Sequence, residues 1–206
     1  MADFVHLTNK TEYSLSEGAL PIARIAELCQ SFSMPAVGIS DNNNMFGALE
    51  FSEQIAKVGV QPILGCNIKI KTPKEYLHEN IEDNDLYFYL NIFSKNNEGY
   101  ENLLKCVSNA YTFNKGNAYV TVDDLIKFKD GLIILSGGNN SILTHSTGHM
   151  ITKQSQQFIS DFKKEFNDNF YIEIQRFGSV DYRLNEEAVL NLAYDYQIPL
   201  VATNDA

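Results

Sequence analysis

The sequence has no tryptophan, three cysteines, four histidines and no long apolar run. Cys29, Cys66 and Cys106 lack the CxxC spacing of a zinc cluster, so we expect buried, reduced thiols rather than a metal cluster or a catalytic nucleophile. No apolar run approaches the ~20 residues that a membrane-spanning helix needs. The opening MADFVHL has no basic region followed by an apolar one, as a secretory signal would. We therefore expect a soluble, cytoplasmic chain with no membrane contact.

Basic side chains are also scarce, since 16 Lys and Arg stand against 26 Asp and Glu, for a net charge of -10. An acidic chain repels phosphate backbones, so these residues alone are a poor candidate for binding duplex DNA. Hydrophobic residues make up 44% of the chain, which is ordinary for a globular protein with a substantial core.

Short apolar runs alternate with helical patterns along the whole chain. Strands are expected at residues 3–8, 35–40, 60–70, 86–94, 131–137, 170–177 and 198–205. Helices are expected at residues 18–33, 44–59, 95–112, 121–129, 151–166 and 180–197, with Thr121 as an N-cap and residues 71–85 as a loop. Strands separated by helices predict a mainly parallel sheet, either a barrel or an open doubly wound sheet.

Both architectures place function at the carboxyl ends of the strands. These ends are rich in Asn, Ser, Gly and Asp and poor in His and Glu. They are Thr8 to Lys10, Ser40 to Asn44, Asn67, Ser94 to Asn96, Ser136 to Asn140, Gln175 to Phe177, and Thr203 to Asp205.

Several segments resemble one family in the right order over nearly the whole chain. They are FVHLTNKTEYSLSEGAL, MPAVGISDNNNMFGALEF, VQPILGCNIKI, IFSKNNEGYENLLKCVS, DGLIILSGG, FYIEIQRFG and IPLVATNDA. The sequence is similar to the N-terminal PHP (polymerase and histidinol phosphatase) domains of bacterial DNA polymerase III alpha subunits. The resemblance implies a single PHP domain over residues 1–206, an N-terminal fragment of a much longer polymerase chain. It also implies a distorted seven-stranded β/α, TIM-like barrel, which this fragment need not complete.

The resemblance also identifies where the metal ligands of PHP enzymes would fall. Such enzymes use His, Asp and Glu to hold two or three Zn²⁺ or Mn²⁺ ions for phosphoester hydrolysis. The corresponding positions in this chain are His6, Thr8, Lys10, Asp41, Asn42, Asn67, Tyr89, Phe177 and Asp205. Only Asp41 and Asp205 keep ligand chemistry, and His6 stands where other PHP proteins carry Asp.

We therefore predict a degenerate site with no catalytic residue, no bound metal and no cofactor in this chain. Lys10 would repel any cation in the pocket. We hypothesise that its ammonium replaces the metal by pairing with Asp41, Asp205 or both, which would hold the barrel mouth together.

The function that the resemblance implies is that of a non-catalytic domain of a replicative DNA-directed DNA polymerase. Its partners would be the remaining polymerase domains, which would supply the Mg²⁺ site and the DNA contacts, and the separate proofreading exonuclease subunit. One alternative is a Zn²⁺- or Mn²⁺-dependent phosphoesterase or 3′–5′ exonuclease, and another is a free-standing binding module.

Three weaker signals favour ordinary structural roles. His78, His145 and His149 lie in polar, loop-like segments, so exposed histidines are expected; the pair His145 and His149 is spaced i, i+4 but has no nearby carboxylate or Cys to complete a metal site. The Gly-rich residues 136–141 follow a strand but lack a P-loop lysine, which favours a simple turn. The aromatic residues 86–93 could stack on bases, but no basic residue interleaves before Lys95, so packing in a buried strand is expected.

Overall fold

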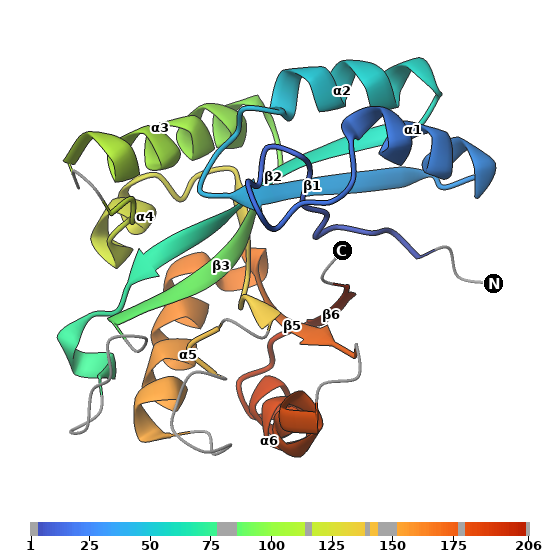
Figure 1. Cartoon of the computed structure of the whole chain (residues 1–206). Helices are drawn as coiled ribbons and strands as arrows, with labels where there is room; N and C mark the ends of the chain where they lie inside the picture. The colour runs from blue at the N-terminus through green and yellow to red at the C-terminus, as the bar shows by residue number, and fades with distance from the viewer. Residues whose placement is uncertain are drawn as a thin grey trace.

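The computed structural model describes residues 4–77, 86–113, 117–138, 141–143, 152–176 and 180–204 (Figure 1). Its sheet has six strands: β1 (Ala36–Asn42), β2 (Gln61–Lys71), β3 (Tyr87–Ser94), β4 (Leu132–Leu135), β5 (Phe170–Gln175) and β6 (Leu200–Thr203). The helices are α1 (Ile22–Ser31), α2 (Ala48–Lys57), α3 (Asn97–Phe113), α4 (Val122–Lys127), α5 (Lys153–Phe166) and α6 (Val180–Asp195), with 3₁₀ turns η1 (Lys74–Tyr76) and η4 (Asn167–Asn169). Within the described ranges, no helix is long and apolar enough to cross a membrane.

The strands follow one another across the sheet in the order of the chain. The pairs β1–β2, β4–β5 and β5–β6 are parallel, but β3 is antiparallel to both β2 and β4. The prediction of a mainly parallel sheet was therefore wrong around β3. The described part of the β2–β3 connection carries only η1, and without a crossover helix the chain turns back beside the strand it has just left.

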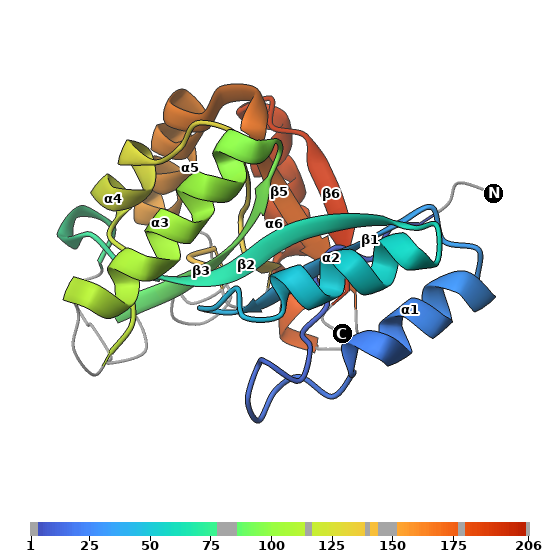
Figure 2. The ribbon, with the colours of Figure 1, turned by 90° about the horizontal axis from the view of Figure 1, so that it is seen from above.

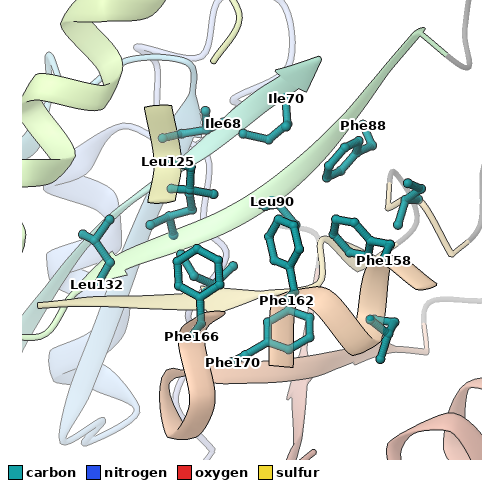
Figure 3. Packing of buried hydrophobic residues seen from close by; sticks show 14 of the residues in the cluster. Ile68, Ile70, Phe88, Leu90, Leu125, Leu132, Phe158, Phe162, Phe166 and Phe170 are labelled. Atoms are coloured by element: carbon teal, nitrogen blue, oxygen red, sulfur yellow. The ribbon is translucent and has the colours of Figure 1, made fainter. Parts of the chain in front are cut away.

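Helices cover the outer face of this curled sheet (Figure 2). The larger core lies between β2 to β5 and the helices α3, α4, α5 and α6. Phe158 and Phe162, one turn apart on α5, lie with ring centroids 4.0 Å apart, and Phe88 of β3 meets Phe158 edge-on at 5.1 Å (Figure 3). A smaller core packs α1 and α2 against β1. The apolar residues that recur at helical spacing on the helices therefore pack against the apolar residues that alternate along the strands, on one face of the sheet.

The N-terminal segment corrects the expectation of seven strands. Residues 4–10 form no strand. They lie along β1 through two backbone hydrogen bonds, from the Gly38 N–H to the His6 carbonyl (2.7 Å) and from the Ser40 N–H to the Asn9 carbonyl (2.9 Å). The Thr8 hydroxyl donates to the Asn204 carbonyl just beyond β6. The described residues thus form a six-stranded half-barrel, with an irregular segment where a seventh strand was expected, and a closed TIM-like barrel is not confirmed.

Candidate functional site: a polar network on the inner face of the sheet

Strand alternation places a row of polar side chains opposite the helix-covered core. Asn67 of β2 and Asn91 of β3 are register partners, and the Asn67 amide donates to Asn91 Oδ1 at 2.8 Å. The Asn91 amide in turn donates to both carboxylate oxygens of Glu173 on β5, at 3.2 and 2.9 Å. All three side chains are buried. A continuous hydrogen-bonded chain therefore links β2, β3 and β5 across the inner face.

Glu173 is the centre of this network, and its side chain is only 2% exposed. Besides Asn91, it accepts hydrogen bonds from Gln175 Nε2 (3.0 Å), the Gly137 N–H (3.2 Å) and the Thr203 hydroxyl. Burial raises the pKa of the Glu173 carboxyl above its ordinary range, although these donors oppose the shift. The carboxylate therefore depends on its neighbours to satisfy it.

Asp41 anchors a different part of the molecule. Its Oδ1 accepts from the Thr11 N–H (2.7 Å) and the Ser14 hydroxyl (2.6 Å), and its Oδ2 accepts from the Thr11 hydroxyl (2.7 Å). The Asn42 N–H closes the cluster by donating to Ser14 Oγ at 3.0 Å. Because Asp41 pairs in register with the core residue Cys66, strand alternation puts its side chain on the outer side. Asp41 therefore fastens the loop at 11–14 to the end of β1.

Lys10 lies at the rim of the half-barrel, near the carboxyl end of β1. Its ammonium is 3.4 Å from the Glu17 carboxylate, which also accepts from the Asn42 side-chain amide. The pKa of Tyr89 is raised by burial and by the nearby charge of Glu17, and is lowered in part by Lys10. The shared partner Glu17 joins Lys10 to Asn42, and the charges of Glu17 and Lys10 act on Tyr89. The predicted pocket residues Lys10, Asn42 and Tyr89 are therefore brought together.

The remaining predicted residues fall in different places. His6 packs edge-on against Phe4, with ring centroids 4.8 Å apart, and Thr8 contacts the residue before Asp205. The hydrogen bonds of Asp41 come from Thr11 and Ser14 rather than from Lys10. Phe177 and Asp205 lie outside the described residues, so the pairing of Lys10 with Asp205 stays a prediction. His78, His145, His149 and residues 139–140 also lie outside them.

The donor chemistry of the site does not fit the metal cluster of a PHP enzyme. At positions where the family resemblance places metal ligands, Lys10, Thr8 and Tyr89 carry an ammonium and two hydroxyl groups, and the oxygens of Asp41 accept hydrogen bonds from Thr11 and Ser14. The amides of Asn91 and Gln175 present N–H groups to Glu173, and N–H groups cannot coordinate a cation. Across the described part of the chain, no group of three or more His, Cys, Asp or Glu is placed to hold a metal ion.

Sequence reasoning missed the two central residues of the network, Asn91 and Glu173. Each interrupts an otherwise apolar strand, in LYFYLNIFS and FYIEIQRF. A polar residue in such a run is a usable signal, because a buried strand tolerates one only when it has hydrogen-bond partners. Parallel strands would bring their ends together, whereas β3 runs in the opposite direction and brings its middle, not its end, beside Asn67.

The three cysteines behave as expected. All are buried and free of disulfides. Burial raises the pKa of the Cys106 thiol to about 12 and raises that of Cys66 further still. Burial therefore disfavours a thiolate nucleophile at Cys66 and Cys106 at neutral pH.

Gly18 controls how the 11–14 loop closes, and Gly18→Ala should be strongly destabilising. A Cβ at this position would overlap the Thr11 carbonyl oxygen, so the loop held by Asp41 would have to move. We expect a loss of about 2–3 kcal/mol in the free energy of unfolding, measured by urea denaturation. Gly59→Ala is the matched control. Gly59 has a φ of 78° but open space around it, so only backbone strain of about 1 kcal/mol is expected. Equal losses in the two variants would contradict the steric explanation.

The curled mixed sheet, with helices outside and a polar network inside, defines an α/β half-barrel. The chain belongs to the PHP domain family, whose match covers residues 6–177. Among curated proteins, the DNA polymerase III subunit alpha of Haemophilus influenzae is 31% identical over 98% of this chain, and that of Caulobacter vibrioides is 35% identical over 98%. The chain spans only 17% and 18% of the length of these two relatives.

Solved structures support the same fold. A protein assigned as a metal-dependent phosphoesterase from Bifidobacterium adolescentis superposes with a TM-score of 0.63, at 12% identity, over 100% of this chain and 88% of its own. An amidohydrolase from Chromobacterium violaceum, solved with sulfate and no metal, gives 0.57 at 11% identity, over 98% of this chain and 86% of its own. At such low identity, these likenesses show the fold alone.

Proposed function

We propose that this chain is the N-terminal PHP domain of a DNA polymerase III alpha subunit, and that it serves the polymerase as a non-catalytic structural domain. The observation that carries the proposal is 30–35% identity to such subunits over 98% of the chain. The parent protein would be the DNA-directed DNA polymerase of chromosome replication, located in the cytoplasm. The Mg²⁺ ions for nucleotide addition would be bound outside these 206 residues.

The non-catalytic role is supported by what replaces the ligands. The polar groups that remain at the site are used by the fold: Asp41 holds the 11–14 loop, and Glu173 binds side chains from β3 and β6. Lys10 adds a positive charge at the rim, where a metalloenzyme would gather anionic ligands. Hydrogen bonds and ion pairs thus supply the cross-links that metal ions would otherwise provide.

A structural domain of this kind would act through contacts with its neighbours. We propose that the remaining polymerase domains pack against it, since its relatives are about six times longer. We also propose that it docks the proofreading exonuclease subunit and that, within the parent protein, the segment at residues 6–10 closes the half-barrel towards β6. The pairing of Lys10 with Asp205 would reinforce that closure.

The alternative is a metal-dependent phosphoesterase or 3′–5′ exonuclease. It is favoured by the function assigned to the Bifidobacterium neighbour, but that likeness extends only to the fold. The replacement of the ligand positions argues against it.

Calorimetric titration of Mn²⁺ and Zn²⁺ into chelator-stripped, tag-free protein tests this proposal. We expect no binding at submillimolar metal, because the site lacks converging anionic ligands. The exposed-surface variant Glu53→Gln would measure nonspecific surface binding. Tight binding of two or more ions, abolished by Asp41→Asn and accompanied by release of a 3′-terminal nucleotide, would establish the phosphoesterase instead.

A further inference from the structure

A lysine and tyrosine surface lies on β2 and β3, beyond the polar network. Lys69 and Lys71 alternate along β2 with Ile68 and Ile70, which are buried in the core, so the two lysines share the opposite face. Tyr87, the register partner of Lys71, lies on the same face of β3. We call Lys69, Lys71, Tyr87, Asn117 and Tyr119 the Lys–Tyr strip.

The strip includes a segment that is remote in sequence. Val120 pairs with Ile70 through two backbone hydrogen bonds, from its own N–H to the Lys69 carbonyl and from the Lys71 N–H to its carbonyl, each 2.9 Å long. Because Val120 is buried, the neighbouring Tyr119 lies on the other side, beside the lysines. Tyr87 and Tyr119 have ring centroids 5.5 Å apart. Two strands and one connecting segment thus build a pair of aromatic rings.

A lysine ammonium lies over each of the two tyrosine rings. The Lys69 ammonium is 4.3 Å from the centroid of Tyr87, and the Lys71 ammonium is 5.4 Å from that of Tyr119. Asn117 holds the first pair in place, since its Oδ1 accepts from Lys69 at 3.0 Å and its Nδ2 donates to the Tyr87 hydroxyl at 2.9 Å. Within the described ranges, neither Lys69 nor Lys71 forms an ion pair with a carboxylate. Both lysines therefore offer positive charge on this face of a chain with a net charge of -10.

This arrangement changes the interpretation of the aromatic strand. The alternate residues Phe88 and Leu90 are buried, as expected, but Tyr87 is only half-buried. Basic residues do interleave with the aromatic ones, but they come from the neighbouring strand and not from the same stretch of sequence. The pairing of β2 with β3 places side by side lysines and tyrosines that lie far apart in the sequence.

We propose that the Lys–Tyr strip binds single-stranded nucleic acid. Aromatic faces stack on unpaired bases, and lysines beside them neutralise the phosphates, which is the combination that single-strand binders use. A duplex stacks its bases inside the helix and leaves few base faces exposed, so the strip favours single strands.

A neighbouring hollow of about 300 Å³, lined in part by Lys71 and Lys74, also contains Glu75 and Asp123. These carboxylates repel phosphate, so the bound nucleic-acid strand runs over Lys69 and Lys71 rather than into the hollow. The proposal is independent of whether the PHP site is catalytic.

Fluorescence anisotropy with a labelled oligothymidylate of about 16 nucleotides tests the proposal. We expect binding at low salt that weakens steeply as salt rises. Lys69→Gln and Lys71→Gln should each weaken binding several-fold and reduce the slope of log K against log salt by about 0.7. Tyr87→Leu should weaken binding about tenfold or more while changing that slope little, because it removes stacking and not charge.

Matched substitutions elsewhere on the surface provide the controls. Lys57→Gln, at the end of α2, removes the same charge from an exposed position outside the strip. Tyr194→Leu removes a tyrosine that is 85% exposed on α6. Both should leave binding unchanged. The proposal is overturned if the wild-type chain does not bind the oligonucleotide at low salt, if the controls weaken binding as much as the strip variants, or if a duplex of the same length binds equally well.

Discussion

Glu173→Ala is expected to lower the free energy of unfolding by about 3–5 kcal/mol, the largest effect of any single substitution considered for this chain. The change leaves the Asn91 amide, the Gly137 N–H and the Thr203 hydroxyl buried without the acceptor they now share. The melting temperature should fall by about 10 °C or more, given the size of the chain. Chemical denaturation with a far-ultraviolet signal measures the loss.

Two variants make this result specific. Glu173→Gln keeps the shape and one acceptor, so its loss in the free energy of unfolding should be clearly smaller, and the exposed Glu53→Ala should have little effect.

Because burial raises the pKa of Glu173, folding takes up a proton at pH values between the ordinary carboxyl pKa and the raised one. Wild-type stability should therefore fall as pH rises through that window, and Glu173→Gln should lose this slope. A Glu173→Ala variant as stable as Glu53→Ala would show that the network contributes nothing to folding.

Asp41→Ala should have the second largest effect, about 3 kcal/mol, because it removes the acceptor of three hydrogen bonds from the 11–14 loop. The change should also loosen the loop before the rest of the chain unfolds. Hydrogen exchange at the Thr11 amide, whose N–H donates directly to Asp41, reports on that local opening.

A double-mutant cycle with Ser14→Ala separates the anchoring contact from a general loss of stability. If the Ser14 hydroxyl and Asp41 act as one unit, the two losses should be less than additive by about 1 kcal/mol or more. Losses that add within about 0.5 kcal/mol would mean that Asp41 stabilises the fold by some route other than the loop.

The sequence predicted most of the secondary structure because the relevant forces are local. Apolar periodicity located all six α-helices found in the described part of the chain, and the expected N-cap at Thr121 accepts a hydrogen bond from the Asp124 N–H. The direction of β3 and the irregular course of residues 4–10 could not be predicted in this way. Both depend on which strands become neighbours, and pairing between strands leaves only a weak trace in the spacing of residues along one of them.

The candidate site was predicted in outline, with its centre misplaced. Family resemblance indicated Lys10, Asn42 and Tyr89, which the structure brings close together, and Asn67, which it places in the network. Glu173 lies within β5 and Asn91 within β3, whereas a mainly parallel sheet directs attention to the residues at strand ends; for Asn91 the antiparallel course of β3 adds to the difference. Asp41 was found, but alternation along β1 turns its carboxylate to the other side of the sheet from Asn67.

The contact between Thr8 and Asn204 sets the order of events during synthesis. The two residues are 196 positions apart, so this contact forms only after residue 204 has been made. At about 5–20 residues per second, Thr8 waits roughly 10–40 seconds before Asn204 emerges. Contacts of such long range are also the slowest to form. Residues 4–10 can pair with β1 much earlier, so their contact with the end of β6 is expected to be among the last to form in this domain.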